Sequence, residues 1–189
     1  MDANRFATCS LHNPRMMRIL AAAIDAVEPS KLVLDYLQKA DLPKHNRVFL
    51  LGIGKASEAM TQAAAEFFDD FMEGLVVTKR ASSPTLRLRS GQARSRITVI
   101  EGGHPVPDER SLAAGQASLD FASKLNEDDA LICLISGGGS ALVTGPREGI
   151  TLADIQSQTS SLLASGATIH EINNLRRQLD RIKGGGLAR

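Results

Sequence analysis

The sequence predicts an α/β protein built on a doubly wound, mostly parallel sheet of the Rossmann-like kind. Short apolar runs at residues 48–51, 74–78, 97–100 and 131–135 alternate with segments of helical spacing. Each run leads into a loop that contains glycine or proline. Because ligands of such sheets bind outside the carboxyl ends of the strands, these loops are expected to meet at one edge and form the site.

Composition narrows the class of protein. The 189 residues carry a formal net charge of +1, 23% charged residues, 4% aromatic residues and no Trp. This gives no electrostatic or stacking case for a nucleic acid or a membrane as partner. Cys9 and Cys133 lie far apart, which favours a reducing compartment. The N-terminal segment has no apolar h-region, so we expect a cytoplasmic protein.

The first 40 residues predict two helices. Residues 15–27 place Met17, Leu20, Ala21 and Ile24 at helical spacing. Pro29-Ser30 is expected to end that helix and cap a second one over residues 31–39. Both helices are expected to cover the sheet.

The first strand, residues 48–51, leads into Gly52, Gly54 and Lys55. Lys55 is expected to begin a helix whose inner face is Ala56, Ala59, Met60, Ala63 and Phe67. The helix dipole disfavours a lysine there unless an anion joins it, so a bound phosphate is one interpretation and a solvated first-turn lysine the other.

Two familiar nucleotide motifs fail at this turn. A P-loop would need Gly at Phe49 and Ser or Thr at Ala56. A dinucleotide fingerprint would need Gly or Ala where Ser57 stands and an acidic residue after the second strand, where Lys79 and Arg80 follow instead. Those two cations would suit only a 2′-phosphate.

Residues 80–96 contain five arginines and no acidic residue among Ser, Pro and Gly. This pattern predicts an exposed basic insertion. Nucleic-acid binding by this loop is the weaker alternative, because no aromatic residue accompanies the charge.

The strand at residues 97–100 precedes a loop with His104, Pro105, Pro107 and Asp108. The prolines predict a stiff, extended loop that presents His104, either to a ligand or in a structural role. Asp108 is expected to cap a helix that reaches about residue 125, with Leu112, Ala113, Leu119 and Phe121 inward.

The run at residues 131–135 is uncharged and predicts a strand buried on both faces, with Cys133 packed as a small apolar residue. Gly137, Gly138, Gly139 and Ser140 follow at once. Without Cβ atoms, consecutive glycines can turn their N–H groups toward an anion, and phosphate is the ligand expected. A tight turn that binds nothing is the alternative.

The last 40 residues predict two more helical segments. Thr151 and Asp154 resemble a capping box. Further on, Glu171, Asn174, Arg177 and Gln178 recur at three- or four-residue spacing and predict a polar stripe on one helical face.

Taken in order, four motifs resemble the amino-terminal domain of the glycerate 2-kinase family, also labelled hydroxypyruvate reductase. They are Gly52-Ile-Gly-Lys-Ala56, Gly103-His-Pro-Val-Pro-Asp-Glu109, Ser136-Gly-Gly-Gly-Ser-Ala-Leu142, and the run from Gly166 through Glu171, Asn173 and Arg176 to Lys183-Gly-Gly. The resemblance implies transfer of the γ-phosphoryl group of ATP to the 2-hydroxyl of D-glycerate, with Mg²⁺ or another divalent cation. Which metal serves stays open.

The resemblance also assigns residues. It implies that Lys55 is catalytic and neutralises charge on the transferring phosphoryl group. Gly52, Gly54, Ser136, Gly137, Gly138, Gly139 and Ser140 would bind ATP. His104, Glu171, Asn174 and Lys183 would line the substrate cleft.

Family members are similar in having a second, carboxyl-terminal domain that closes the cleft, whereas this chain stops at Arg189. We therefore expect residues 1–189 to be the amino-terminal α/β domain alone, with little kinase activity and a tendency to form homo-oligomers. Two alternatives stay open: an NAD(P)H-dependent hydroxypyruvate reductase, and a nucleotide-binding remnant that does not catalyse.

Overall fold

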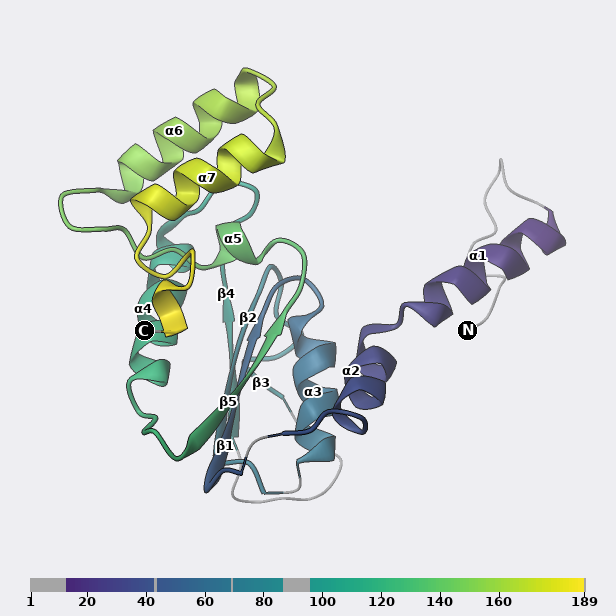
Figure 1. The fold of residues 1–189 in the computed structure, drawn as a ribbon. Coiled ribbons are helices and arrows are strands. Elements are labelled where there is room, and N and C mark those ends of the chain that lie inside the picture. The colour runs from purple at the N-terminus through teal and green to yellow at the C-terminus, as the bar shows by residue number, and fades with distance from the viewer. Residues whose placement is uncertain (1–12, 43, 69, 87–95, 189) are drawn as a thin grey trace.

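A five-stranded sheet in the order β3-β4-β2-β1-β5 forms the centre of the molecule (Figure 1). The structure is a computed structural model that describes residues 13–42, 44–68, 70–86 and 96–188. The strands are β1 (Arg47–Ile53), β2 (Glu73–Thr78), β3 (Thr85–Leu86), β4 (Arg96–Glu101) and β5 (Asp129–Ile135). The β2–β4, β1–β2 and β1–β5 pairs are parallel and the β3–β4 pair is antiparallel, so the predicted doubly wound, mostly parallel sheet is confirmed.

Helices α2 and α3 cover one face of the sheet, and α4 and α5 cover the other. The helices are α1 (Pro14–Ala26), α2 (Pro29–Leu37), α3 (Ser57–Phe67), α4 (Glu109–Ala122), α5 (Gly139–Leu142), α6 (Leu152–Ala164) and α7 (Ile169–Leu179), followed by the 3₁₀ turn η2 (Gly186–Ala188). Alternate residues of β1 point to opposite faces. Leu50 therefore packs in the core under α2 and α3, and Leu51 in the core under α4 and α5.

The first helix does not cover the sheet as predicted. In Figure 1, α1 projects away from the body, and its side chains Ile19, Ile24 and Val27 are exposed. The second helix begins at Pro29, and the side chain of Glu28, rather than Pro29-Ser30, caps it by accepting from the Lys31 N–H.

The inner faces of α3 and α4 are shifted from those predicted. The third helix begins at Ser57, because Gly54 has φ +132° and the Ser57 hydroxyl donates to the Gly54 and Val77 carbonyls, which holds Lys55 in the turn. Thr61, Ala64 and Ala65 face inward, whereas Phe67 is exposed. In α4, Ser111, Ala114, Gly115, Ser118 and Phe121 are buried, and Ala113 is exposed.

The prediction that residues 131–135 form a strand buried on both faces is wrong. Strand β5 is the last strand on its side of the described sheet, so part of it faces solvent. Cys133 is exposed rather than packed, and Ile135 is 69% exposed.

The described ends of the predicted basic insertion, residues 80–96, include regular structure. Thr85 and Leu86 form β3 and pair with β4, which itself begins at Arg96. Residues 87–95 lie outside the described residues, as does Cys9, so the prediction stays open for them. No helix in the described ranges is long and apolar enough to cross a membrane.

Candidate anion-binding site

The site lies where the strand order reverses. Strand β1 has β2 on one side and β5 on the other, and the crevice at the carboxyl ends of such neighbours is where open α/β sheets bind ligands. The loops that leave β1 and β5 touch there. The Lys55 N–H donates to the Gly137 carbonyl at 3.0 Å, and the Ala56 N–H to the Ser136 hydroxyl at 3.0 Å. The predicted lysine turn and glycine loop are therefore neighbours.

Gly138 lies between the side chains of Lys55 and His104. A Cβ atom at this position would lie 3.2 Å from Lys55 Cε and 3.2 Å from His104 Cδ2. Gly138 also has φ +96°, a conformation that side chains disfavour. A side chain here would thus fill the space beside the lysine and the imidazole.

The other glycines differ in what they do. A Cβ on Gly52 would come within 2.2 Å of Thr61 Oγ1, so Gly52 allows α3 to pack closely on β1. A Cβ on Gly54 would meet Ser136 Oγ at 2.2 Å. Gly137 has nothing within 4 Å of its Cβ position and Gly139 approaches Ile53, so Gly137 offers open backbone.

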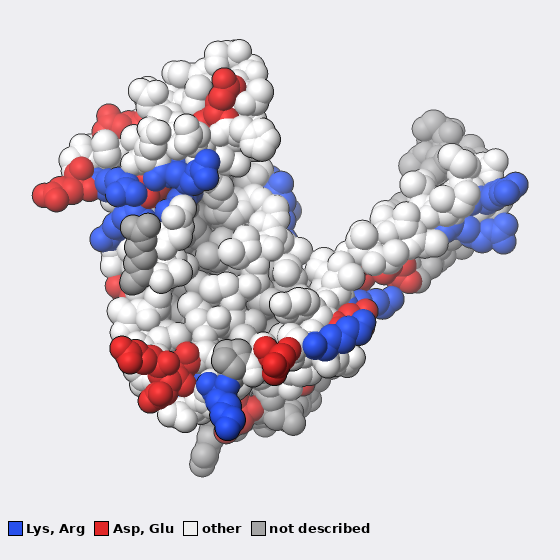
Figure 2. Space-filling model, viewed as in Figure 1, with Lys and Arg blue, Asp and Glu red and all other residues white. Residues whose placement is uncertain are grey.

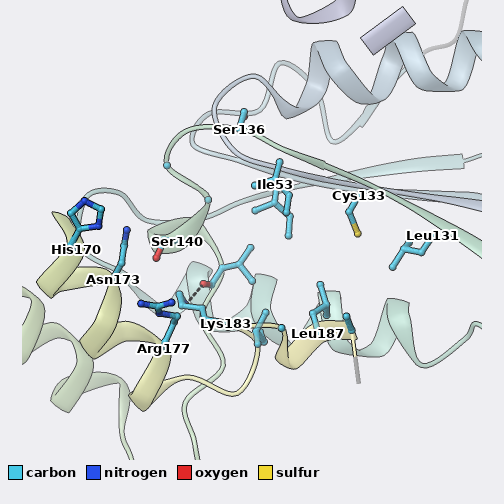
Figure 3. A pocket seen from close by; sticks show the side chains of 18 residues that line it. Ile53, Leu131, Cys133, Ser136, Ser140, His170, Asn173, Arg177, Lys183 and Leu187 are labelled. Atoms are coloured by element: carbon cyan, nitrogen blue, oxygen red, sulfur yellow. Dashed lines mark hydrogen bonds between the residues drawn. The ribbon is translucent and has the colours of Figure 1, made fainter. Parts of the chain in front are cut away.

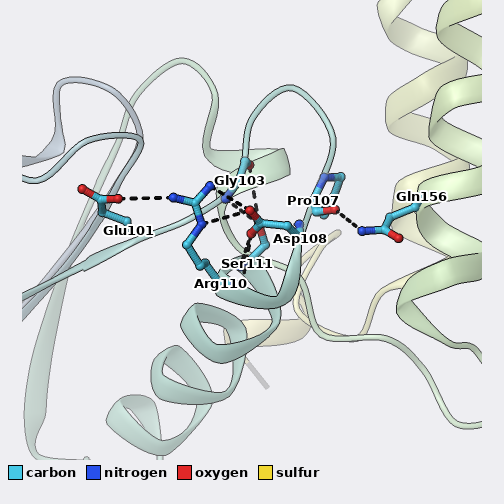
Figure 4. Close-up of polar contacts among 7 residues, drawn as sticks. All are labelled: Glu101, Gly103, Pro107, Asp108, Arg110, Ser111 and Gln156. Atoms are coloured by element: carbon cyan, nitrogen blue, oxygen red, sulfur yellow. Dashed lines mark hydrogen bonds and ion pairs between the residues drawn. The ribbon is translucent and has the colours of Figure 1, made fainter.

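Figure 4 shows how the loop that carries His104 is held. Asp108 caps α4 by accepting from the Arg110 and Ser111 N–H groups, as predicted, and its carboxylate pairs with the Arg110 guanidinium. The Gly103 N–H donates to the Ser111 hydroxyl at 2.8 Å, and Gln156 of α6 donates to the Pro107 carbonyl at 2.9 Å. The loop is therefore fixed from both ends.

Several cations lie around His104. Burial lowers the pKa of the imidazole, and the charges of Lys55, Lys79 and Arg176 lower it further. Among the described residues, neither Lys55 nor Arg176 pairs with a carboxylate. Burial and these charges thus favour the neutral imidazole beside an excess of positive charge.

The glycine loop forms part of the wall of a cavity of about 800 Å³ (Figure 3). Its apolar wall includes Leu131, Cys133 and Ile135 of β5. Its polar lining comprises Ser136, Ser140, His170, Asn173, Arg177 and Lys183. Lys55 and His104 do not line it, but Gly138, which they flank, does.

Lys183 is anchored at the cavity wall. Its ammonium donates to the Val143 carbonyl at 2.8 Å and to the carboxylate of Asp180, which is 1% exposed. Asp180 also accepts from the Thr144 hydroxyl at 2.7 Å and the Gly145 N–H at 3.1 Å. Burial lowers the pKa of Lys183, while the carboxylate of Asp180 opposes that shift.

Comparison with known proteins identifies the family. Residues 15–189 match a family model described as a domain of unknown function, DUF4147. The chain belongs to the DUF4147 family. Among its relatives, it is 40% identical to the D-glycerate 2-kinase of Thermotoga maritima, over 91% of this chain and 39% of that protein. It is 39% identical to a putative hydroxypyruvate reductase of Agrobacterium vitis, over 92% of this chain and 37% of that protein.

A solved structure has the same fold as this DUF4147 chain. The crystal structure of the Thermotoga maritima glycerate kinase superimposes with a TM-score of 0.75 at 39% identity, over 89% of this chain and 39% of that one. The resemblance to the glycerate 2-kinase family is confirmed. The chain spans about 39% of the length of these relatives.

The DUF4147 chain brings only part of the predicted site together. The glycine loop, Lys55 and His104 are neighbours, and Lys183 lies across the cavity. Glu171 instead caps α7, where its carboxylate accepts from Thr168 at 2.8 Å, which lowers its pKa. Asn174 is exposed and does not line the cavity, whereas its neighbour Asn173 does.

Sequence reasoning also missed side chains of α7 and of the turn after it. Arg176 and Asn173 stand in the last motif, but the motif alone does not assign them a role, and no sequence pattern singles out Asp180. The polar stripe is predicted through Glu171, Asn174, Arg177 and Gln178. The face of α7 that lines the cavity is His170, Asn173 and Arg177, so Arg177 is the one residue of the predicted stripe that lies on it.

Proposed function

We propose that this DUF4147 chain supplies the ATP-binding part of a glycerate 2-kinase, which transfers the γ-phosphoryl group of ATP to the 2-hydroxyl of D-glycerate. The observation that carries the proposal is the contact between the turn at Lys55 and the glycine loop, with Gly138 between Lys55 and His104. The names of the relatives from Thermotoga maritima and Pyrococcus horikoshii support the substrate.

The geometry favours a nucleotide whose phosphates lie along the glycine loop. Ser136, Gly138, Gly139 and Ser140 line the cavity, so a nucleoside bound against its apolar wall can reach the loop with its phosphates. Lys55 would then neutralise charge on the transferring phosphoryl group from the other side of Gly138. Positioning and charge neutralisation supply most of the catalysis in phosphoryl transfer, so a strong base is not required.

The described residues do not fit a divalent cation held by the protein alone. They contain no cluster of three or more His, Cys, Asp or Glu side chains that could hold one. The carboxylates near the loops, Asp108 and Asp180, are already paired with Arg110 and Lys183. Mg²⁺ in kinases is held largely by substrate phosphates, and we derive no step through it.

The reductase alternative rests on the names of the Agrobacterium vitis relatives. Lys79 and Arg80, after β2, would suit the 2′-phosphate of NADPH and not NADH. Binding measurements separate the two functions, since a kinase binds ATP and a reductase saturates with NADPH. A nucleotide-binding remnant that does not catalyse would bind ATP but would not hydrolyse or transfer it.

The test is ATP binding by the purified chain, measured by titration calorimetry. We expect Lys55→Gln to weaken ATP binding by about tenfold or more, the effect of losing one charge-assisted contact. Lys31→Gln is the matched control, because Lys31 lies on α2 and pairs at 3.5 Å with Asp25. Saturable NADPH binding without ATP binding would overturn the proposal.

The same preparation tests turnover. We propose that these residues alone release little ADP in the presence of ATP and D-glycerate, because they match only about 39% of the length of the glycerate kinase relatives. Robust ADP release that depends on glycerate would contradict this part of the proposal.

A further inference from the structure

Arg176 lies between two loops without an anionic partner. Its guanidinium reaches from α7 to the Ser140 hydroxyl at 3.4 Å and the Pro105 carbonyl at 3.2 Å. Its Nε is buried and has no hydrogen-bond partner. Burial lowers the pKa of this side chain. The side chain is half-buried, so part of its guanidinium is removed from water, and two contacts with neutral oxygens compensate for that loss only in part.

The surroundings of Arg176 add positive charge instead of balancing it. The guanidinium acts together with Lys55 and Lys79 to lower the pKa of His104, and it also lowers the pKa of Lys183. In the described part of the chain, no ion pair joins Arg176, Lys55 or Lys79 to an acidic residue. Like charges gathered from β2, the β1 turn and α7 disfavour one another unless an anion joins them.

The chemistry of the guanidinium identifies the kind of anion. Arginine offers a planar fork of donors that matches two oxygens of a phosphoryl or carboxylate group, and such charge-assisted pairs are stronger than neutral ones. We infer that Arg176 binds an oxyanion, phosphoryl or carboxylate, between the glycine loop and the His104 loop, on the side of Gly138 where Lys55 lies. The inference rests on the proposed function only for the identity of that anion.

Arg176 and Arg177 are adjacent in α7 but have different contacts. Consecutive helical residues point about 100° apart. Arg177 lines the apolar cavity, whereas Arg176 contacts Ser140 and Pro105. An anion held beside Lys55 therefore depends on Arg176, and one held inside the cavity depends on Arg177.

The experiment compares four variants of the full chain, Arg176→Gln, Arg176→Lys, Arg177→Gln and Arg181→Gln. The probes are ATP, inorganic phosphate and D-glycerate, and calorimetry gives each Kd. We expect Arg176→Gln to weaken binding of at least one probe by about tenfold or more, and Arg176→Lys, which keeps the charge without the fork, to give an intermediate loss. Arg181→Gln is the control with the same change of charge, because the exposed Arg181 guanidinium donates to the side-chain oxygen of Gln116, away from the glycine loop.

The probe that loses affinity identifies the anion. A loss for phosphate and ATP identifies a phosphoryl group, and a loss for D-glycerate alone identifies a carboxylate. The inference is overturned if Arg177→Gln loses more affinity for the probes than Arg176→Gln does. It is also overturned if Arg176→Gln binds every probe as tightly as Arg181→Gln. A wild-type chain that binds none of the probes also overturns it.

The proposed function and this inference can fail separately. A wild-type chain that binds phosphate through Arg176 but not ATP rejects the kinase and keeps the oxyanion site. ATP binding that is unaffected by Arg176→Gln keeps the kinase and rejects the role of Arg176. Melting temperatures identify any of the four variants that does not fold. If Arg176→Gln does not fold, the deciding measurement is made on the wild type, where addition of phosphate should shift the nuclear magnetic resonance signals of the His104 ring. No shift there counts against the inference.

Discussion

Gly138 is the residue whose backbone the proposed anion site depends on most directly. We expect Gly138→Ala to weaken ATP binding by about tenfold or more, because the new methyl group would lie 3.2 Å from Lys55 Cε and 3.2 Å from His104 Cδ2. The positive φ of +96° adds a cost of about 1–2 kcal/mol to folding. Calorimetry with ATP and urea unfolding of the same protein measure the two effects.

Gly149→Ala is the matched control for this prediction. Gly149 also has a positive φ, +77°, but nothing lies within 4 Å of its Cβ position. Both variants should therefore lose similar folding free energy, and only Gly138→Ala should lose ATP affinity. Equal loss of affinity in the two would show that backbone strain, and not the space beside Lys55, limits binding.

His104 should make anion binding depend on pH. Its pKa lies below the ordinary 6.5 because of burial and the cations Lys55, Lys79 and Arg176. A bound anion offsets those cations and raises the pKa, so binding takes up a proton and tightens as pH falls from about 7 through the His104 titration. If anion binding raises the pKa of His104 by one unit, the affinity for the anion increases by about tenfold at most.

Sulfate is the suitable probe for this pH dependence, because its own charge does not change between about pH 5 and 8, the range in which histidine titrates. Its Kd, measured across that range, should fall toward low pH in the wild type and stay nearly flat in His104→Gln. Tighter binding at high pH would contradict the expected sign.

At the scale of elements, the turn between α7 and η2 is held by one buried ion pair. Asp180 binds Lys183, the Thr144 hydroxyl and the Gly145 N–H, and it is 1% exposed. We expect Asp180→Asn to lower the free energy of unfolding by about 3–5 kcal/mol, because it leaves the Lys183 ammonium buried without its anion. Urea unfolding gives the value.

Asp154→Asn is the comparison for this loss. Asp154 is an exposed helix cap that accepts from Thr151, so its replacement should cost about 1 kcal/mol. If the two variants are equally stable, the buried pair contributes no more than a surface cap.

Hydrophobic periodicity and capping residues predicted most of the elements. The four parallel strands, Asp108 as the cap of α4 and Thr151 as the cap of α6 all follow from local sequence. The exposure of β5 does not, because an uncharged run looks the same in the middle of a sheet and at its edge. Strand order is set by contacts between distant segments, which the run itself does not encode.

Candidate site residues that lie on loops could be predicted from the sequence, whereas those on helix α7 were missed. Glycines after a strand predict a turn whatever packs nearby, and turns that follow parallel strands meet at one edge of the sheet. For this reason the sequence predicts that Gly138 and Lys55 lie close together. The face that a helix presents depends on its rotation, and a shift of one residue exchanges Asn174 for Asn173. Arg176 was missed for the same reason.

At the scale of the whole molecule, the body presents a hollowed, largely uncharged surface below a group of Lys and Arg side chains at the level of α7 (Figure 2). Strand β5 lies along this face, with Ile135 69% exposed and no charged residue from Ala130 to Ser140. Edge strands of monomeric proteins usually carry a charge or a proline that prevents pairing. In β5 the charged residue is Asp129 at its first position, whose buried carboxylate already pairs with Arg47, and the rest of the strand carries neither a charge nor a proline. The predicted homo-oligomer therefore has a candidate interface.

We expect the chain to self-associate in the micromolar range through this edge, and Ile135→Lys to shift it toward the monomer in sedimentation velocity. Tyr36→Lys is the control, because Tyr36 is 71% exposed on α2 and gains the same charge away from β5. Since Ile135 also lines the cavity, ATP and the second copy would compete for one surface, and ATP should dissociate the assembly. A wild type that stays monomeric at every concentration, or an assembly that both variants disrupt equally, would remove β5 as the interface.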